Sequence, residues 1–455
     1  MGDIKTTSLV NDKWILILIF IGALAIRLIP VMNLPNQFRY PVHDAAEYDI
    51  LAMNLLEGKG LIDIKTGSGL PSSWRVPLYP LFLASIYAIF GHNYFLVRVI
   101  QCIMGALVCV FIFFIGKEIF GRRIGFLSAI ITAFYKPFIF YLNFGGPAFL
   151  LSENLFTFLL VLSVFYLVKD YCVQSNLKNS IISGILIGLA ALTRPVIALF
   201  PFFIFGPLLY KIRRTFKFAL NKTLIMLISF VIVIVPWIAR NYFVHRAFIP
   251  FSTEGGFLLL VSNNPYVRGA GLQSVDSLFS EEERNQLSKM TEVQRDRVYR
   301  SRAVDFLFRN YKKLPKLFCR KLLAFWDLYT TFYYQDNSRT RRYDIWFATV
   351  FMFGIVGIFK SIKSKLNVGG SLLILLLLYF CIITLIFNGE PRFRYPIEPY
   401  VIIFASVGIL YLYDNFKNKF LSYLAIGLII IINFLFYAKG DLVLNYARYL
   451  LNILL

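Results

Sequence analysis

Carboxylates and arginines recur beside the ends of long apolar stretches in this chain. A carboxylate can accept the proton of a hydroxyl as that hydroxyl attacks a carbon atom. A guanidinium can bind a phosphate through two parallel hydrogen bonds and stabilise the charge that develops on it. These residue types therefore suit the transfer of a group from a phosphate ester to a hydroxyl. The residues are Asp44, Glu47, Arg75, Glu153, Arg194, Arg240, Glu390, Arg392 and Arg394.

The composition places these charges in a membrane protein. Of the 455 residues, 58% are hydrophobic and only 16% are charged, and the mean hydropathy is +0.66. A soluble domain averages about 45–50% apolar residues. So much apolar surface exceeds what one water-soluble core can bury.

The net charge of +22 does not indicate nucleic-acid binding. The lysines and arginines cluster in short segments between apolar stretches, where the positive-inside rule expects them. The 5 cysteines have no paired spacing and the chain has only 3 histidines. The cysteines therefore indicate neither a disulfide framework nor a zinc site, and so few histidines disfavour a histidine-rich metal centre.

We interpret about eleven apolar stretches as membrane spans. They lie near residues 14–33, 94–116, 122–143, 150–169, 179–193, 195–210, 220–239, 345–360, 370–388, 396–413 and 420–437. The first is longer than the apolar part of a cleaved signal peptide and lacks a cleavage site, which favours a signal anchor with a cytoplasmic N-terminus.

Alternation of the spans places the basic loops inside and the carboxylate and arginine residues named above at the outer ends. The inner residues would be Lys117, Arg122, Arg123, Lys169, Lys178, Lys211, Arg213, Arg214, Lys217, Lys222, Lys360, Lys363, Lys365, Lys417 and Lys419. The apolar segment 78–90 is too short to span. Treating it as a span would move Arg122 and Arg123 outside, so we predict an outer juxtamembrane or re-entrant helix.

Three parts are expected along the chain. Residues 1–239 form an N-terminal membrane module that includes an acidic outer loop at 34–93. Residues 240–344 form an outer soluble insertion whose end, 314–334, has the pattern of an amphipathic helix on the membrane surface. Residues 345–455 form a C-terminal membrane module. The expected fold is an all-α polytopic bundle.

The outer position of the charged residues narrows the chemistry. A site at the membrane rim can meet a donor that is itself anchored in the lipid, such as a sugar linked to a lipid phosphate. No glycine-rich nucleotide-binding loop is present, which makes a soluble nucleotide sugar less attractive as the donor.

Eight sequence elements, in this order, resemble the GT-C glycosyltransferases of the family 39 type. They are HDAAEY (43–48), AMNLLEGKG (52–60), RVPLYPLFLA (75–84), LLSENLF (150–156), ALTRP (191–195), VPWIARNY (235–242), SNNP (262–265) and PRFRYPIEP (391–399). The resemblance covers about residues 10–415. Such enzymes are membrane transferases that use polyprenyl-phosphate sugars, among them protein O-mannosyltransferases and the aminoarabinose transferase of lipid A.

The resemblance implies a GT-C type bundle and an inverting glycosyltransferase that acts on the outer side of the membrane. The acceptor hydroxyl would belong to a lipid, a glycan or a protein. The resemblance also implies that Asp44 is the general base and Glu153 a second catalytic acid. The residues implied for the donor phosphate are Arg75, Arg194, Arg240, Arg392, Arg394 and Tyr395. His43, Glu47 and Tyr48 would lie near donor and acceptor.

Two departures from the family pattern bear on metal binding and on the acceptor. Asp44 is followed by Ala45, where protein mannosyltransferases carry Glu. At the end of the first loop this chain has Arg75 and then Val76-Pro77, where the aminoarabinose transferase has a Glu just before a Lys-Pro pair. The second change removes a zinc ligand of that relative. We therefore predict no cofactor and no metal site, and leave a divalent metal open. The additional lumenal domain of eukaryotic protein mannosyltransferases is missing, so a protein acceptor gains no support.

Each residue also has a structural explanation. Asp44 could cap a helix, and Glu153 could only pair with an arginine. Arg194 precedes a proline at a helix break, and Arg240 could only anchor its helix at the interface. Arg392 and Arg394 could bind lipid headgroups instead of a substrate. His43 could be an ordinary loop residue. The spacing of Gly184 and Gly188 indicates a role in close helix packing.

Two other functions remain open at this stage. A lipid or polysaccharide transporter would do no covalent chemistry, but it should hold its charges near mid-membrane. A non-catalytic partner of an envelope assembly complex would tolerate alanine throughout the outer cluster. The expected location is a bacterial cell (inner) membrane with the site facing the periplasm or exterior.

Overall fold

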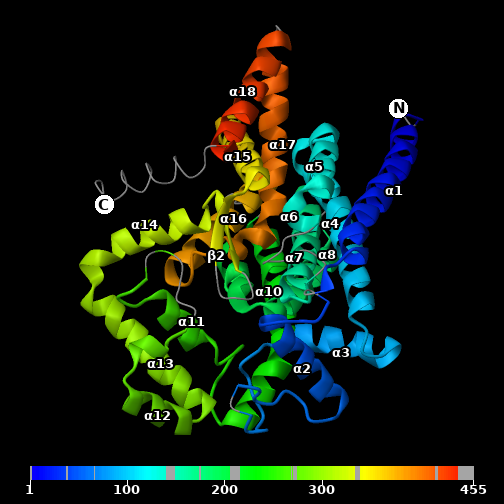
Figure 1. The fold of residues 1–455 in the computed structure, drawn as a ribbon. Coiled ribbons are helices and arrows are strands. Elements are labelled where there is room, and N and C mark those ends of the chain that lie inside the picture. Colours follow the sequence, from blue (N-terminus) through cyan, green and yellow to red (C-terminus); the bar gives the residue numbers. More distant parts are fainter. Residues whose placement is uncertain are drawn as a thin grey trace.

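The computed structural model is helical almost throughout (Figure 1). It describes residues 3–36, 39–65, 67–139, 149–173, 176–204, 216–267, 269, 274–333, 339–415 and 419–438. The first part contains α1 (Asp3–Met32), α2 (Asp44–Leu56), α3 (Leu78–Phe90), α4 (Tyr94–Phe120), α5 (Arg122–Phe134), α6 (Lys136–Ile139), α7 (Ser152–Val168), α8 (Leu177–Thr193) and α10 (Phe216–His245).

The second part begins with α11 (Gly255–Ser262), α12 (Glu281–Lys289), α13 (Glu292–Arg309) and α14 (Leu314–Phe325). An antiparallel hairpin of β1 (Tyr329–Tyr333) and β2 (Arg339–Tyr343) follows, with Tyr329 opposite Tyr343. The chain continues through α15 (Ile345–Lys363), α16 (Val368–Ile386), α17 (Glu398–Asn415) and α18 (Lys419–Ala438). Short helical turns are η2 (Lys169–Val173), η3 (Pro195–Ile197), η5 (Asp276–Leu278), η6 (Tyr311–Lys313) and η7 (Pro391–Ile397).

Within the described ranges, eight helical segments are long and apolar enough to cross a membrane, which confirms a polytopic helical protein. They are Lys13–Met32, Tyr94–Phe120, Ser152–Cys172, Leu220–His245, Ile345–Lys363, Val368–Ile386, Pro391–Asn415 and Phe420–Tyr437. Three shorter apolar helices are Leu78–Phe90, Leu177–Thr193 and Pro195–Ile204. The first of these is the predicted outer helix that is too short to span.

The expected spans 179–193 and 195–210 correspond to the shorter apolar helices Leu177–Thr193 and Pro195–Ile204, and residues 205–210 lie outside the described ranges. The break between them at Arg194 agrees with the prediction. Arg194 has extended backbone angles (φ −148°, ψ 115°), because the residue before a proline is disfavoured in the helical region. This separates α8 from the helix that follows. The expected span 122–143 divides at Tyr135 into α5 and α6, and its last four residues lie outside the described ranges.

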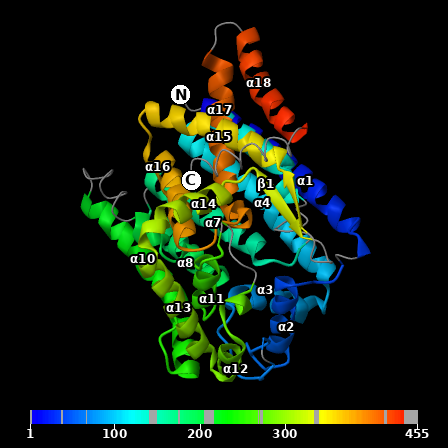
Figure 2. The same cartoon turned by 60° about the vertical axis from the view of Figure 1, so that its left-hand side comes forward.

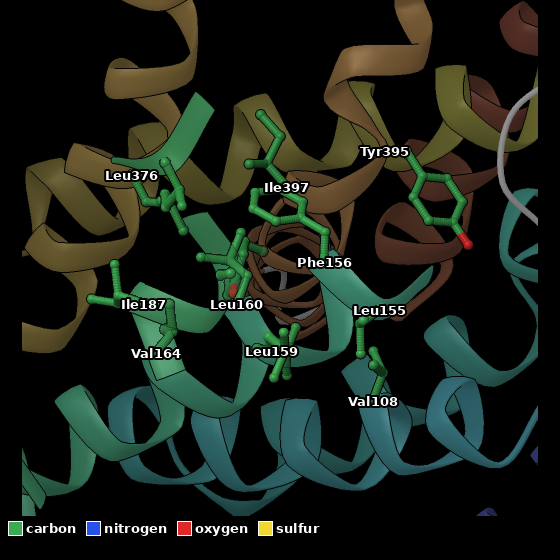
Figure 3. Packing of buried hydrophobic residues seen from close by; sticks show 14 of the residues in the cluster. Val108, Leu155, Phe156, Leu159, Leu160, Val164, Ile187, Leu376, Tyr395 and Ile397 are labelled. Atoms are coloured by element: carbon green, nitrogen blue, oxygen red, sulfur yellow. The ribbon is translucent and has the colours of Figure 1, made fainter. Parts of the chain in front are cut away.

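The bundle is centred on α7, which packs against α4 and α8. Its side chains Leu155, Phe156, Leu159 and Leu160 fill the space between neighbouring helices, together with Ile397 from η7 (Figure 3). Burial of such large apolar side chains packs the helices tightly around one shared core. The first turn of α7 is therefore held in place on all sides.

Glycines allow the closest helix crossings. A Cβ atom on Gly184 or Gly188 of α8 would collide with α10, at the Met226 carbonyl and the Val233 side chain respectively. This confirms the predicted packing role of these two glycines. The crossing of α15 and α17 uses Gly357, where a Cβ atom would overlap the carbonyl of Phe404.

The predicted basic loops and the predicted carboxylate and arginine site residues lie at opposite ends of the bundle. Arg123 at the start of α5 contacts Asp414 near the end of α17, with 3.1 Å between Nη1 and Oδ2. The helices α2, α3 and α11 to α13 lie at the other end in both views (Figures 1 and 2). Lys222 differs from the prediction of an inner loop, because it is buried in α10 with its Nζ 2.8 Å from Oδ1 of Asp170.

The segment 240–344 packs at the same end of the bundle as α2 and α3. Helices α11 and α13 pack together around a small apolar cluster that includes Leu260, Phe279 and Ala303. The amphipathic helix expected over 314–334 is α14, and the prediction was wrong over its last part. The helix ends at Phe325, because Arg394 donates hydrogen bonds to the carbonyls of Phe325 and Asp327 and fixes a turn there before β1.

The α15–α17 crossing predicts a strong effect of one methyl group. We expect Gly357→Ala to destabilise the protein by roughly 1–3 kcal/mol or more, because the helices must move apart. Thermal unfolding in detergent would measure this. Gly427→Ala in α18 is the matched control, since a Cβ atom there meets no other atom within 4 Å. Equal melting of the two variants would contradict the proposed close crossing.

Candidate active site at the outer ends of the helices

Asp44 joins two arginines from distant parts of the chain. Its Oδ1 lies 2.8 Å from Nη2 of Arg75, and its Oδ2 lies 3.0 Å from Nη1 of Arg392. Asp44 begins α2, Arg75 ends the first outer loop and Arg392 lies in η7. The structure thus brings together three of the residues predicted from the sequence.

Glu153 joins Arg392 to a third arginine. Its Oε1 accepts a hydrogen bond from Nε of Arg392 and lies 2.8 Å from Nη1 of Arg194. The Glu153 side chain is only 1% exposed and sits in the first turn of α7, where the positive end of the helix dipole favours a carboxylate. Glu153 is therefore the buried carboxylate that pairs with both Arg194 and Arg392.

Arg75 binds two further carboxylates. Its Nη2 lies 2.6 Å from Oε2 of Glu47, and its Nη1 lies 3.2 Å from Oε1 of Glu254. The guanidinium also lies 5.3 Å from the ring centre of Tyr48, a cation–π distance. Glu254 was missed from the sequence because it belongs to the soluble insertion, and no local pattern links that segment to the first loop.

The local structure answers the question whether Asp44 only caps a helix. The N-cap position of α2 is His43, an exposed residue with φ 52°, and no side chain caps this helix end. Asp44 instead directs its carboxylate to the arginines. His43 is next to the cluster in sequence, and its side chain faces solvent.

The eight charged side chains of the cluster balance one another. Four carboxylates, Asp44, Glu47, Glu153 and Glu254, face four cations, Lys65, Arg75, Arg194 and Arg392; Lys65 contacts Glu47. Each arginine already contacts at least one carboxylate. An incoming anion must therefore displace a carboxylate to reach these guanidiniums.

The two acids on either side of Arg75 differ in their proton affinity. Burial raises the pKa of Asp44, but the charges of Arg392 and Arg75 outweigh burial and hold that pKa well below its usual range. Burial raises the pKa of Glu254, and Arg75 only partly offsets this. At neutral pH Asp44 is thus an ionised carboxylate whose basicity is suppressed by its two arginines.

Two predicted phosphate ligands lie elsewhere. Arg240 donates to the Ser72 and Leu61 carbonyls and to Ser73, and stacks on Trp237. This supports the interface-anchor explanation for Arg240.

Arg394 also points away from the cluster. Its Nε lies 2.9 Å from Oε1 of Glu398, and its Nη1 donates to the Phe325 and Asp327 carbonyls. In a 3₁₀ turn, unlike the extended loop we expected, Arg392 and Arg394 point in different directions. Arg394 holds η7 against the end of α14.

The remaining predicted residues lie beneath the cluster. The Tyr48 hydroxyl donates to Ser152 at 3.3 Å. Tyr395 is buried, and its hydroxyl lies 3.5 Å from Oδ1 of Asn154 (Figure 3). Sequence reasoning missed Asn154 and also Arg27, although an arginine inside an otherwise uncharged span is a signal of function in itself.

Lys321 of α14 supports the segment that carries Arg392. Its Nζ donates to Oδ1 of Asn263 and to the Leu385 carbonyl, and its own carbonyl lies against Gly389. Burial lowers the pKa of Lys321 to about 7. The insertion, through α14, therefore helps to position Arg392.

Among the residues that the structure describes, no group of three or more His, Cys, Asp and Glu side chains is arranged to hold a metal ion. The carboxylates of the cluster converge on guanidiniums instead.

Comparisons with known proteins give both a family match and a fold. Residues 74–239 match the family of dolichyl-phosphate-mannose-protein mannosyltransferases. The oligosaccharyltransferase AglB from Archaeoglobus fulgidus, in complex with an inhibitory peptide and a dolichol-phosphate, superposes with a TM-score of 0.54 at 14% identity, over 97% of this chain and 55% of that chain. The structure of ArnT from Cupriavidus metallidurans bound to undecaprenyl phosphate superposes with a TM-score of 0.51 at 11% identity, over 98% of this chain and 73% of that chain.

The chain has the GT-C glycosyltransferase fold. It spans about half the length of the archaeal oligosaccharyltransferase. No curated protein matches its sequence. The matched segment 74–239 contains Arg75, Glu153 and Arg194 of the cluster, while Asp44 and Arg392 lie outside it.

The buried ion pairs of Glu153 predict a stability effect. We expect Glu153→Gln to cost roughly 3–5 kcal/mol, because it leaves Arg194 and Arg392 without a buried counter-charge. Thermal or denaturant unfolding in detergent would measure it. Glu283→Gln is the matched control, because Glu283 is an exposed partner of Arg302 and should change stability by about 0–1 kcal/mol. Equal effects of the two substitutions would argue against a buried network.

Proposed function

We propose that this GT-C protein is an inverting glycosyltransferase. It would transfer one sugar from a polyprenyl-phosphate donor to the hydroxyl of a lipid, glycan or protein acceptor on the outer side of the membrane. The observation that carries the proposal is the Asp44–Arg392–Glu153 arrangement at the outer helix ends. No divalent metal is assigned to the reaction.

Asp44 is the proposed general base. It would accept the proton of the acceptor hydroxyl as the acceptor oxygen bonds to the anomeric carbon and the bond from that carbon to the phosphate oxygen breaks. Attack opposite to the leaving group inverts the anomeric configuration. The phosphate leaves with the bonding electron pair, and the arginines stabilise its charge.

The arginines connect binding of the donor phosphate with the basicity of Asp44. Because Arg75 and Arg392 hold the Asp44 carboxylate in the resting structure, a phosphate that takes either arginine would release Asp44 from part of its cationic environment. The pKa of Asp44 would then rise toward its ordinary value and the carboxylate would become a stronger base. Arg194 would stabilise the phosphate from its place beside Glu153.

The comparisons support the donor class. The solved AglB structure contains a dolichol-phosphate and the ArnT structure contains undecaprenyl phosphate. The matched family is described by a dolichyl-phosphate-mannose donor. Both carriers are polyprenyl phosphates, and the sugar and the acceptor of this chain are left to experiment.

The distribution of charge supports the orientation. Lys117, Arg123 and Lys360 lie at or near the bundle end opposite to Glu153, and basic residues favour the cytoplasmic face. The proposed site then faces the periplasm or exterior of a bacterial cell (inner) membrane. Glu47, Tyr48 and His43 would lie near donor and acceptor, and Tyr395 beneath them.

Substitution of the base tests the catalytic assignment. We expect Asp44→Asn to reduce sugar transfer roughly 10²- to 10⁴-fold, the usual contribution of a general base. Mass spectrometry of lipid-linked sugars and envelope glycans, with and without the protein, would identify the substrates, and transfer would then be followed in detergent. Asp414→Asn, at the opposite end of the bundle, is the control and should transfer normally. Full activity of Asp44→Asn in a folded preparation would remove the proposed base.

Removal of divalent metals tests whether the proposed sugar transfer needs a metal ion. We expect transfer to survive an excess of chelator, because guanidiniums occupy the positions around Asp44 and Glu153 that a metal would need. The rate before and after chelation, and after added Mg²⁺, Mn²⁺ or Zn²⁺, would decide. Activity that is lost on chelation and regained with metal would show that the cluster rearranges around an ion.

A further inference from the structure

Glu254 is an acid of the outer cluster to which the proposed transfer gives no role. It directly precedes α11 in the segment 240–344, at the same end of the bundle as α2 (Figures 1 and 2). Its Oε1 and Oε2 lie 3.2 and 3.4 Å from Nη1 of Arg75. Both side chains are largely buried, with 18% of Glu254 and 12% of Arg75 exposed. Glu254 therefore covers one donor of a guanidinium that the proposed transfer needs for the phosphate.

Glu254 is the most weakly held of the three carboxylates on Arg75. Glu47 accepts from Nε and Nη2 of Arg75 at 2.9 and 2.6 Å and also pairs with a lysine. Asp44 lies 2.8 Å from Nη2 and also pairs with a second arginine. Glu254 makes the longest contacts, and within the described ranges its ion pairing is to Arg75 alone. An anion that approaches Arg75 therefore displaces Glu254 most easily.

The main chain beside Glu254 is fixed, so that only its side chain has to move. The Thr253 N–H donates to the carbonyl of Ser73 at 3.0 Å, two residues before Arg75. The carbonyl of Glu254 accepts from the Leu258 N–H at 2.9 Å in the first turn of α11. Rotation between side-chain rotamers can thus carry the carboxylate away from Arg75 and back again.

Binding of a donor changes the charge of the cluster. The four carboxylates and four cations of the cluster cancel, and a sugar–phosphate diester adds one negative charge. Burial raises the pKa of Glu254, and Arg75 only partly offsets this, whereas the pKa of Asp44 is held well below its usual range. Glu254 is thus the acid that can give up Arg75, by turning away or by taking up a proton.

The product of the proposed transfer binds cations more strongly than the donor does. Loss of the sugar turns the phosphate diester into a monoester, which carries about −1.5 to −2 charges at pH 7. The proton of the acceptor hydroxyl is then on Asp44, whose neutral carboxyl no longer competes for Arg75. The carrier phosphate would stay on this guanidinium unless another anion took its place.

We propose that Glu254 competes with the lipid phosphate for Arg75, so that the donor displaces it on binding and its return releases the phosphate of the used carrier. This inference rests on the function proposed above and adds a role for the segment 240–344. The exchange makes and breaks no covalent bond. Once Asp44 has lost its proton to solvent and the monoester has left, the cluster is again balanced.

Competition by a carboxylate depends on pH. The charged groups around Glu254 come from α2, the first outer loop, the end of α8 and α13, and they are Asp44, Glu47, Arg75, Arg194, Glu292, Asp296 and Arg300. They are the same in a variant that differs only at Glu254. As the pH rises through the raised pKa of Glu254, its carboxylate ionises and competes more strongly. Phosphate binding to the wild type should therefore weaken relative to such a variant.

Binding of undecaprenyl phosphate to the purified full-length protein in detergent tests the proposal. We expect Glu254→Gln to bind this lipid about tenfold more tightly than the wild type at about pH 8, because a competing charge-assisted contact is gone. The ratio of the two affinities should fall toward one at about pH 5, where Glu254 takes up a proton. The ratio is the measure because the lipid phosphate itself titrates in this range. Glu282→Gln, which removes an exposed acid of α12 in the same segment, is the charge-matched control and should bind as the wild type at each pH.

A variant that keeps the charge separates contact from repulsion at a distance. Glu254→Asp retains the carboxylate on a side chain that is one methylene shorter, and the fixed main chain keeps it from reaching Nη1 of Arg75. We expect it to bind undecaprenyl phosphate at about pH 8 as tightly as Glu254→Gln does, since both lack the contact. Affinity equal to that of the wild type would assign the effect to general repulsion and overturn the competition.

Turnover gives a second readout that a purely structural role would not produce. We expect Glu254→Gln to lower both the KM for the donor and kcat, and to strengthen inhibition by undecaprenyl phosphate, because release of the product becomes slower. A structural role would raise KM instead.

The outcomes separate this inference from the proposed function. Folded Glu254→Gln and Glu254→Asp that bind undecaprenyl phosphate as the wild type does at each pH would overturn the competition and leave the proposed transfer intact. Wild-type protein that does not bind undecaprenyl phosphate would overturn the donor class and this inference with it. Glu254→Asp decides alone where Glu254→Gln does not fold.

Discussion

Arg392 is the connection on which the site depends. Its guanidinium contacts Asp44, 348 residues earlier, and Glu153, 239 residues earlier. One side chain thereby joins the first outer loop, the central helix α7 and the turn before α17. Charge-assisted hydrogen bonds of this kind fix direction as well as distance, so the geometry of both carboxylates follows from where η7 is held. Lys321 and Arg394 hold it there from the insertion side.

The balance of charge explains how such a polar cluster can exist at the edge of a membrane. Glu153 is almost inaccessible to solvent, and an unpaired carboxylate there would be expensive. The guanidiniums of Arg194 and Arg392 compensate it, and Arg392 together with Arg75 keeps Asp44 ionised. The arrangement also leaves no unopposed cation in the cluster.

Periodicity and hydropathy were enough to predict the helical fold, the short helix α3 and the convergence of Asp44, Glu153 and Arg392 at one end of the bundle. Periodicity and hydropathy are local signals, and each of these features is marked by such a signal in the sequence. The sequence did not distinguish Arg392 from Arg394, because a 3₁₀ turn and an extended loop project alternate side chains differently. Glu254 was missed for another reason. Its contact with Arg75 joins distant segments, and nothing in its neighbouring residues marks it. Arg27 did carry a local signal, its place inside an apolar span, and was overlooked.

The order of the ion pairs along the chain has a consequence for biosynthesis. Asp44 and Glu153 each have one arginine partner that follows soon after, Arg75 for Asp44 at a separation of 31 residues and Arg194 for Glu153. They share a second partner, Arg392, that is made much later. A nascent chain can therefore neutralise each acid while its helices are still being inserted. Arg392 joins the two early pairs only after η7 has been made, so a partly synthesised chain lacks the complete cluster.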